Sequence, residues 1–172
     1  MNISQQRELR QYVFGLGNAT HNLPGAEQEI LNITRQFDGS VGYTGQEATK
    51  QRLFDEAGTY EIIHLATHGV YDKQHPMFSY LELASEALYA REIFGLELGA
   101  NLVTLSGCET LLPQQINTED LDALVRGDEL VGFVRAFLYA GVPSVVSSLW
   151  RVNDAATQRL METFYQQLPQ LG

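Results

Sequence analysis

A cysteine and a histidine each follow a short apolar run, and together they could carry out nucleophilic catalysis. Cys108 is the only cysteine of the chain and lies in the stretch NLVTLSGCET, residues 101–110. His68 lies in the stretch YEIIHLATHG, residues 60–69. A cysteine peptidase uses a thiol as nucleophile and an imidazole as the neighbouring base. The two residues therefore predict a Cys–His dyad, provided that the fold brings their side chains together.

The two apolar runs are expected to be neighbouring strands of a parallel sheet. Residues 101–105 are too few for a helix, include β-branched residues and stop before Gly107, which is typical of a strand buried on both faces. The dyad residues lie 40 positions apart (108 minus 68), which is enough chain for a crossover that contains a hairpin and a helix. Clefts form at the carboxyl edge of open parallel sheets, so both side chains are expected at that edge.

Each dyad residue also has a structural interpretation. Cys108 on its own is compatible with a buried structural thiol, a common place for a free cysteine. His68 on its own is compatible with a histidine at a strand end that bonds a backbone carbonyl. The phosphatase alternative is excluded, because the sequence ETLLP after the thiol offers no arginine to hold a phosphate.

The spacing of His64 and His68 suggests a metal site, but the surrounding residues do not support one. Residues four apart on a strand share a face, and HLATH therefore resembles a pair of ligands. The glutamate of a zinc-hydrolase helix is missing, and a single cysteine cannot build a Cys/His zinc cluster. We therefore expect no metal and no other cofactor, and we interpret His64 as a core histidine or one that supports the site.

Composition limits the class of protein. The chain has 172 residues, of which 44% are hydrophobic, and this predicts one globular domain, residues 1–172. Its 11 basic and 21 acidic residues give a net charge of −10 without a basic cluster, so a nucleic-acid partner is not expected. The first residues lack the apolar core of a signal peptide, and no apolar run is long enough to span a membrane. These features predict a cytoplasmic protein without a membrane partner.

The order of the predicted elements indicates an α/β fold. Strands are expected at 12–16, 41–43, 60–69, 101–105 and 144–149. Helices are expected at 23–37, 44–57, 87–94, 128–140 and 155–168. Residues 79–84 alternate like a small exposed ribbon, and residues 111–127 are expected to form a surface loop. Regular alternation of strands and helices predicts a mainly parallel sheet with helices on both faces.

The last predicted helix has an amphipathic pattern. Its inward face is expected to comprise Leu160, Met161, Phe164 and Leu168. Asn153 or Asp154 is expected to cap its amino end.

Several motifs, taken in order, resemble those of CHAT domains, the caspase-like peptidase modules of bacteria that often follow tetratricopeptide repeats. The motifs are HLATHG, LVTLSGCET, GFVRAFLYAGVPSVVSSLWRVND and LMETFYQQL, and the resemblance covers roughly residues 23–168. It implies a three-layer α-β-α caspase-like fold with a mainly parallel central sheet. It also implies that Cys108 attacks a peptide carbonyl, that His68 protonates the leaving amine, and that the backbone amides of Gly69 and Cys108 form the oxyanion hole.

A further group of residues could line the substrate groove: Asp72, Ser79, Ser147, Ser148, Trp150 and Asp154. The ring of Trp150 would offer a wall for a peptide at the cleft edge, although the same ring is equally suited to covering the core. Asp154 could select a basic residue before the scissile bond, whereas its position at a helix start favours capping.

The expected function is that of a cysteine endopeptidase that hydrolyses a protein or peptide substrate in bacterial signalling. The resemblance implies that such a module stays latent until a partner or a repeat domain activates it. CHAT domains usually continue with another helix and a final strand, whereas this chain ends at Gly172, so we expect it to lack that segment. The alternative is a catalytically silent module of the same fold that binds a peptide or protein.

Overall fold

The structure is a computed structural model that describes residues 12–72, 74–106, 131–147 and 154–168. Within these ranges, five strands form one sheet in the order β2-β1-β3-β7-β8, and every neighbouring pair is parallel. The strands are β1 Val13–Gly17, β2 Val41–Thr44, β3 Ile62–Ala66, β7 Leu102–Ser106 and β8 Ser144–Ser147. The predicted parallel α/β architecture is confirmed.

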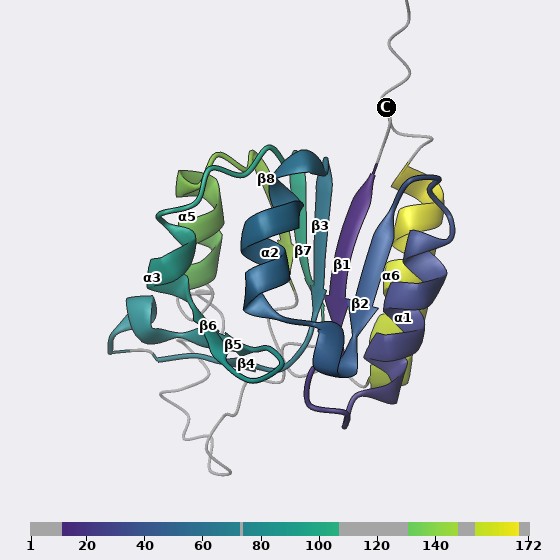
Figure 1. The fold of residues 1–172 in the computed structure, drawn as a ribbon, viewed down its shortest axis with the longest axis horizontal. Coiled ribbons are helices and arrows are strands. Elements are labelled where there is room, and N and C mark those ends of the chain that lie inside the picture. The colour runs from purple at the N-terminus through teal and green to yellow at the C-terminus, as the bar shows by residue number, and fades with distance from the viewer. Residues whose placement is uncertain (1–11, 73, 107–130, 148–153, 169–172) are drawn as a thin grey trace, which may run out of the picture.

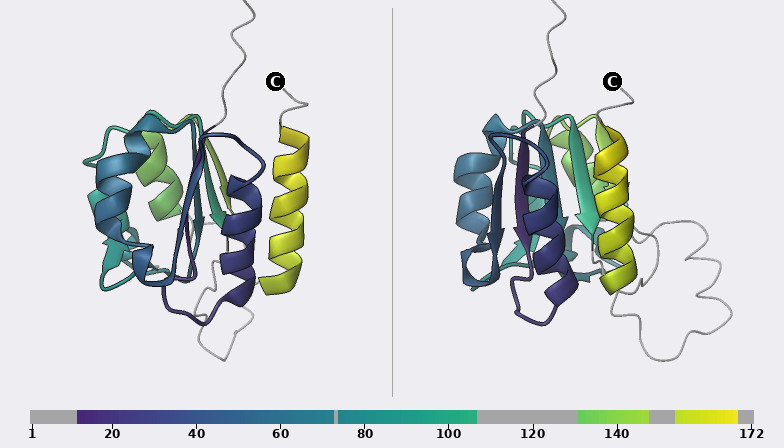
Figure 2. Two further views of the ribbon diagram at one scale, coloured as in Figure 1. Left: turned by 45° about the vertical axis from the view of Figure 1, so that its right-hand side comes forward. Right: turned by 90° about the vertical axis from the view of Figure 1, so that its right-hand side faces the viewer.

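Helices cover both faces of this sheet, which gives three layers (Figures 1 and 2). On one face lie α1 (Pro24–Thr34) and α6 (Asp154–Gln167), and they pack against each other. The other face carries α2 (Lys50–Glu56), α3 (Ala90–Ile93) and α5 (Val131–Tyr139). Such a sheet flanked by helices is consistent with a caspase-like fold.

A small antiparallel sheet lies beside the carboxyl end of β3. Its strands are β4 (Gly69–Val70), β5 (Tyr80–Glu82) and β6 (Ala87–Tyr89), in the order β4-β5-β6. It corresponds to the ribbon predicted at 79–84. Three short 3-10 helices complete the described elements: η1 (Gly45–Glu47), η2 (Ala57–Thr59) and η3 (Pro76–Phe78).

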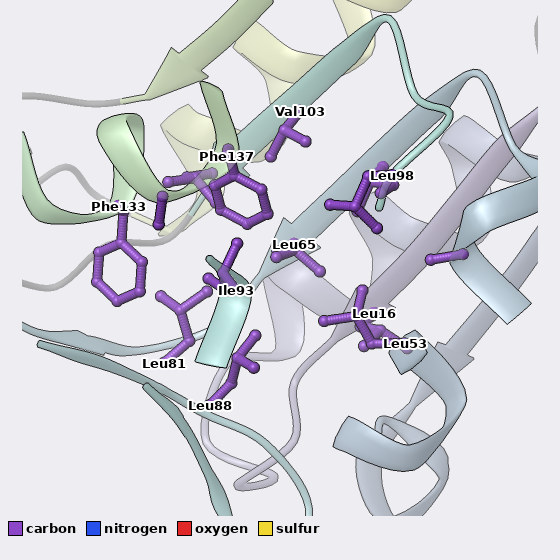
Figure 3. Close-up of a cluster of buried hydrophobic side chains, with 14 of the residues drawn as sticks. Leu16, Leu53, Leu65, Leu81, Leu88, Ile93, Leu98, Val103, Phe133 and Phe137 are labelled. Carbon is purple, nitrogen blue, oxygen red and sulfur yellow. The ribbon is translucent and has the colours of Figure 1, made fainter. Parts of the chain in front are cut away.

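The described core residues form one large cluster on one side of the sheet and two smaller clusters on the other side. The larger cluster lies between the sheet and α2, α3 and α5, and includes Leu65, Val103 and Phe137, all fully buried (Figure 3). One of the smaller clusters lies under α1 and α6 and includes Met161 and Tyr165, and the other joins Ile30 of α1 to Ala66 of β3. Alternate residues of β3 and β7 therefore face opposite cores, as expected for a strand with both faces covered.

Helix α1 packs close to the sheet because glycines face it. A Cβ atom on Gly42 of β2 would lie 2.6 Å from the Ile30 side chain, and one on Gly17 of β1 would lie 2.5 Å from the same residue. Both distances are shorter than real Cβ contacts allow. The small residues of β1 and β2 are therefore a packing requirement of this face.

Three local predictions were wrong. The helix expected at 44–57 is split into η1 and α2, because Thr49 is extended and its side chain caps α2 by accepting from the Arg52 N–H at 3.3 Å. The helix expected at 87–94 begins only at Ala90, because residues 87–89 pair with β5 as a strand. Leu160, expected to face inward, is 63% exposed, whereas the buried side chains described on that helix are Thr157, Met161 and Tyr165.

No helix in the described ranges is long and apolar enough to cross a membrane.

Candidate active site

The backbone at His68 is fixed by hydrogen bonds to both sheets. Thr67, one residue past β3, donates its N–H to the Ser106 carbonyl at 3.2 Å and so extends the pairing with β7. The His68 carbonyl in turn accepts the N–H of Glu82 at 2.8 Å. His68 therefore lies where the chain leaves the parallel sheet and enters the small antiparallel sheet, and its side chain is half-buried there.

The imidazole of His68 contacts the loop between β1 and α1. Its Nε2 atom lies 2.8 Å from Oδ1 of Asn22, and the same oxygen accepts a hydrogen bond from the Thr20 hydroxyl at 2.6 Å. An amide oxygen can only accept, so Nε2 donates in this arrangement. The contact could not be predicted from the local sequence, because Asn22 is an exposed loop residue 46 positions before the histidine.

The backbone N–H of Gly69 points away from the neighbouring strand. Gly69 is opposite Leu81 in the β4–β5 pair, and the bond from the Glu82 N–H to the His68 carbonyl flanks this position. Hydrogen-bonded and non-hydrogen-bonded pairs alternate along an antiparallel ladder, and His68–Glu82 is a hydrogen-bonded pair. The next pair, Gly69–Leu81, is therefore non-hydrogen-bonded, and the N–H and carbonyl of Gly69 face outward. Among the described strands β4 is an outer strand of its sheet. The Gly69 amide is thus directed away from β5.

Some of the predicted site residues lie outside the described residues: Cys108, Ser148 and Trp150. Asp154 is the first residue of α6, in agreement with its predicted place at a helix start. Ser147 is the last residue of β8 and is opposite Leu105 of β7. Ser147 is thus at the same carboxyl edge of the sheet as His68.

Asp72 and Ser79 shape the segment that follows β4. The Ser79 hydroxyl accepts the Asp72 N–H at 3.0 Å, and the Ser79 side chain is fully buried. Oδ1 of Asp72 accepts the N–H groups of Gln74 and His75 at 3.0 and 2.8 Å. These contacts organise the loop, while contact of either residue with a substrate stays a prediction.

His64 belongs to a buried polar cluster under α1 and α6. Its Nε2 lies 2.7 Å from Oε1 of Glu29, and its Nδ1 lies 3.1 Å from the Tyr165 hydroxyl and also bonds the Thr104 hydroxyl. All four side chains are at most 1% exposed. Burial raises the pKa of the Tyr165 phenol well above its ordinary value, although the hydrogen bond with Thr104 opposes the change. The interpretation of His64 as a core histidine is confirmed.

The Glu29 carboxylate was missed as a partner of His64. Glu29 follows Ala26 by three positions and precedes Ile33 by four. That spacing places Glu29 on the buried face of α1, and it was the sequence signal that could have identified Glu29 as a core residue.

In the part of the chain that the structure describes, no three His, Cys, Asp or Glu side chains are grouped so that they could hold a metal ion.

An open depression of about 530 Å³ lies at the other end of the sheet. It is lined by Gly58, residues 96–99 and residues 139–141, which precede β3, β7 and β8 respectively. Because the residues of the predicted site follow these strands, the depression is separate from the carboxyl edge that carries His68.

Comparison with known proteins extends the resemblance from separate motifs to the whole chain. The family model for the CHAT domain matches residues 2–172. The chain is 26% identical to Tetratricopeptide repeat protein 28 of Mus musculus and 23% identical to its counterpart in Homo sapiens, each over an alignment of 184 positions. These alignments cover 85% of this chain but only 7% of either relative, so the chain spans a small part of their length. Since the family model matches nearly the entire chain, and the parallel sheet with helices on both faces agrees with it, this chain belongs to the CHAT domain family, a caspase-like family.

Proposed function

We propose that this domain is a cysteine endopeptidase in which Cys108 is the nucleophile and His68 is the general acid and base. The observation that carries the proposal is the register of the two central strands, in which Ala66 of β3 is opposite Ser106 of β7. His68 and Cys108 each follow one of these paired residues by two positions. Both residues therefore come directly after neighbouring strands that run in the same direction.

Covalent geometry supports a short distance between the two residues. Two residues of extended chain span at most about 7 Å, so the Cα atom of Cys108 cannot lie farther than that from the Cα atom of Ser106. Neighbouring strands are about 4.8 Å apart. The Thr67–Ser106 hydrogen bond keeps the strands together up to the residue before His68. In the proposed arrangement, the imidazole and the thiol attached to these positions meet across the carboxyl edge.

The proposed reaction begins with attack of the Cys108 sulfur on the carbonyl carbon of the scissile peptide bond. The thiol proton passes to the imidazole of His68, which then gives it to the leaving amine as the carbon–nitrogen bond breaks. Water hydrolyses the resulting thioester, with the imidazole accepting a proton from the water. The free acid product leaves, and the thiol regains its proton.

The Gly69 amide is proposed as one donor of the oxyanion hole, with the Cys108 amide as the other. The outward direction of the Gly69 N–H supports this role, because a bond within the β4–β5 ladder would have occupied the donor. Gly69 also has no Cβ atom, so a substrate carbonyl can approach its backbone closely. A fixed backbone donor stabilises the negative charge that develops on the carbonyl oxygen.

The proposed substrate is a protein or peptide bound across the carboxyl edge, near Ser147 and the predicted groove residues Ser148 and Trp150. A regulatory partner is proposed as well. Its support is that the relatives are named as tetratricopeptide repeat proteins and that this chain covers only 7% of each. A repeat domain is therefore a natural candidate for the partner that activates the peptidase.

The test is digestion of a peptide library, read by mass spectrometry, with the wild type, Cys108→Ala and His68→Ala. Cleavage by the wild type that disappears in both variants would support the proposal. A second arm adds an electrophilic peptide that captures a catalytic thiol. Stoichiometric capture without turnover of any peptide would favour the catalytically silent binding module instead.

A further inference from the structure

The contact between His68 and Asn22 points to a residue that positions the proposed base. The inference rests on the proposed function, because it concerns the proton exchange of the dyad. Nε2 of His68 lies 2.8 Å from Oδ1 of Asn22, and the Thr20 hydroxyl donates to the same oxygen at 2.6 Å. The amide therefore receives two hydrogen bonds from different parts of the chain, which fixes its orientation toward the ring.

The loop that carries Asn22 is attached to the strand that carries His68. The N–H of Asn18 donates to the carbonyl of Ala66, the last residue of β3, at 3.0 Å. Asn18 is only 3% exposed and has a positive φ of 48°. Its side chain accepts the Leu23 N–H at 2.8 Å and donates to Glu27 at 2.8 Å. The loop is thus held at both ends, and Asn22 lies between these two fixed points.

The hydrogen bond selects one form of the imidazole. A neutral imidazole has one N–H donor and one acceptor nitrogen. With the proton on Nε2 and bonded to Asn22, the nitrogen that can accept a proton is Nδ1. When the ring is protonated, Nε2 still carries its proton and can still donate to the same oxygen. The ring therefore does not have to rotate between accepting and releasing the proton at Nδ1.

We propose that Asn22 is a positioning residue that holds His68 in the tautomer with the proton on Nε2, so that Nδ1 exchanges the proton with the Cys108 thiol. A triad works by the same logic when its third member orients the histidine and fixes its tautomer. Asn22 supplies this function from the loop between β1 and α1, through a side-chain amide.

The first test measures the tautomer itself and does not depend on activity. Ring ¹⁵N chemical shifts of the 172-residue chain are recorded in a Cys108→Ala background, and the His68 signals are assigned by their loss in His68→Gln. The Nε2–H tautomer is expected to dominate with Asn22 present. Asn22→Ala is expected to lower the ratio of the Nε2–H to the Nδ1–H tautomer severalfold. Asn22→Asp keeps an acceptor oxygen and is expected to leave this ratio close to that of the protein with Asn22. A dominant Nδ1–H tautomer, or a ratio unchanged in Asn22→Ala, would overturn the inference.

The second test measures the reactivity of Cys108 toward a small alkylating agent. Asn22→Ala is expected to reduce the rate about tenfold, because orientation is part of what a general base contributes. Asn22→Asp should stay within about twofold of the wild type, since it keeps the acceptor. Gln28→Ala removes an exposed amide of α1 that bonds Asn32 at 3.0 Å and serves as the matched control. The two tests separate the inference from the proposed function. If Asn22→Ala changes the tautomer ratio but the thiol reacts equally fast in wild type and His68→Gln, the proposed function is contradicted, while the role of Asn22 in fixing the tautomer of His68 is confirmed.

Discussion

Glu29 and His64 form the buried polar pair that connects α1 to the central strand of the sheet. Their side chains are 1% and 0% exposed, and the distance between Oε1 and Nε2 is 2.7 Å. Buried polar groups are stable only when they have partners, and a group left alone in the core is costly. Thr104 and Tyr165 complete the cluster from β7 and α6. These four residues therefore hold α1 and α6 against β3 and β7, the two strands that precede the proposed dyad residues.

Replacing Glu29 by leucine should destabilise the protein by about 3 kcal/mol, because the imidazole of His64 then remains in the core without its partner at Nε2. The free energy of unfolding in urea measures the loss. Gln28→Leu, one position earlier on the exposed face of α1, should change it by less than about 0.5 kcal/mol. The double variant Glu29→Leu/His64→Leu should lose less than the sum of the two single variants, and strict additivity would show that the pair is not coupled.

Lys50 connects α2 to β6 and α3. Its Nζ lies 2.7 Å from Glu86 and 3.0 Å from Glu92, and it donates to the Ala87 carbonyl at 3.2 Å. The bond with Glu86 is the main cause that raises the pKa of Lys50, although burial opposes it. Burial by itself would raise the pKa of the Glu92 carboxyl, but the hydrogen bonds from the Tyr89 N–H and from Lys50 outweigh it and lower this pKa.

Lys50→Met should therefore reduce stability in a pH-dependent way. The lowered pKa of the Glu92 carboxyl stabilises the folded protein above about pH 4.3, the ordinary pKa of a glutamate, and this contribution is lost as the pH falls through the folded pKa. The raised pKa of Lys50 stabilises the folded protein below about pH 10.4, the ordinary pKa of a lysine, and this contribution is lost as the pH rises through the folded pKa. We expect a loss of about 1 kcal/mol at pH 7 that shrinks below about pH 4. Urea unfolding at both pH values measures it, with Arg35→Met, an exposed cation after α1, as control. A constant difference across this range would contradict the assignment of the charges.

Gly132→Ala should weaken the packing of α5 against η3. A Cβ atom at position 132 would lie 2.5 Å from the Pro76 carbonyl oxygen, and a backbone atom cannot move aside as the end of a side chain can. We expect a loss of about 2 kcal/mol from overpacking, measured by chemical unfolding. Gly58→Ala is the matched control, because the nearest heavy atom to its Cβ would be 3.9 Å away. Equal stabilities of the two variants would mean that α5 does not approach Pro76 as closely as described.

Across the whole molecule, the elements that position the site could be predicted from the sequence, but the contacts between them could not. The strands of His68 and Cys108 are short, apolar and bounded by glycine, and this local pattern was enough to predict β3 and β7 as neighbours. Asn22 and Glu29 contact histidines 46 and 35 positions away, respectively, and no local pattern encodes such contacts. The exposed position of Leu160 likewise depends on how α6 packs against α1.

The site and the open depression lie at opposite ends of the sheet. His68, Gly69 and Ser147 are at its carboxyl edge, whereas the depression is lined by residues that precede the same strands. The sheet and its two helix layers therefore separate the proposed chemistry from the amino edge (Figure 1).

The most direct test of the account is the rate at which iodoacetamide alkylates Cys108 at neutral pH in the wild type and in His68→Gln. The chain has one cysteine, so each adduct detected by intact mass reports on that thiol. An ordinary thiol, with a pKa of about 8.5, is mostly protonated at neutral pH and reacts slowly without a base beside it. We predict that the wild type reacts about tenfold faster than His68→Gln, because the imidazole accepts the thiol proton. His75→Gln, at an exposed loop histidine, should react like the wild type. Equal rates in wild type and His68→Gln would show that the imidazole does not act on the sulfur and would contradict the proposed dyad.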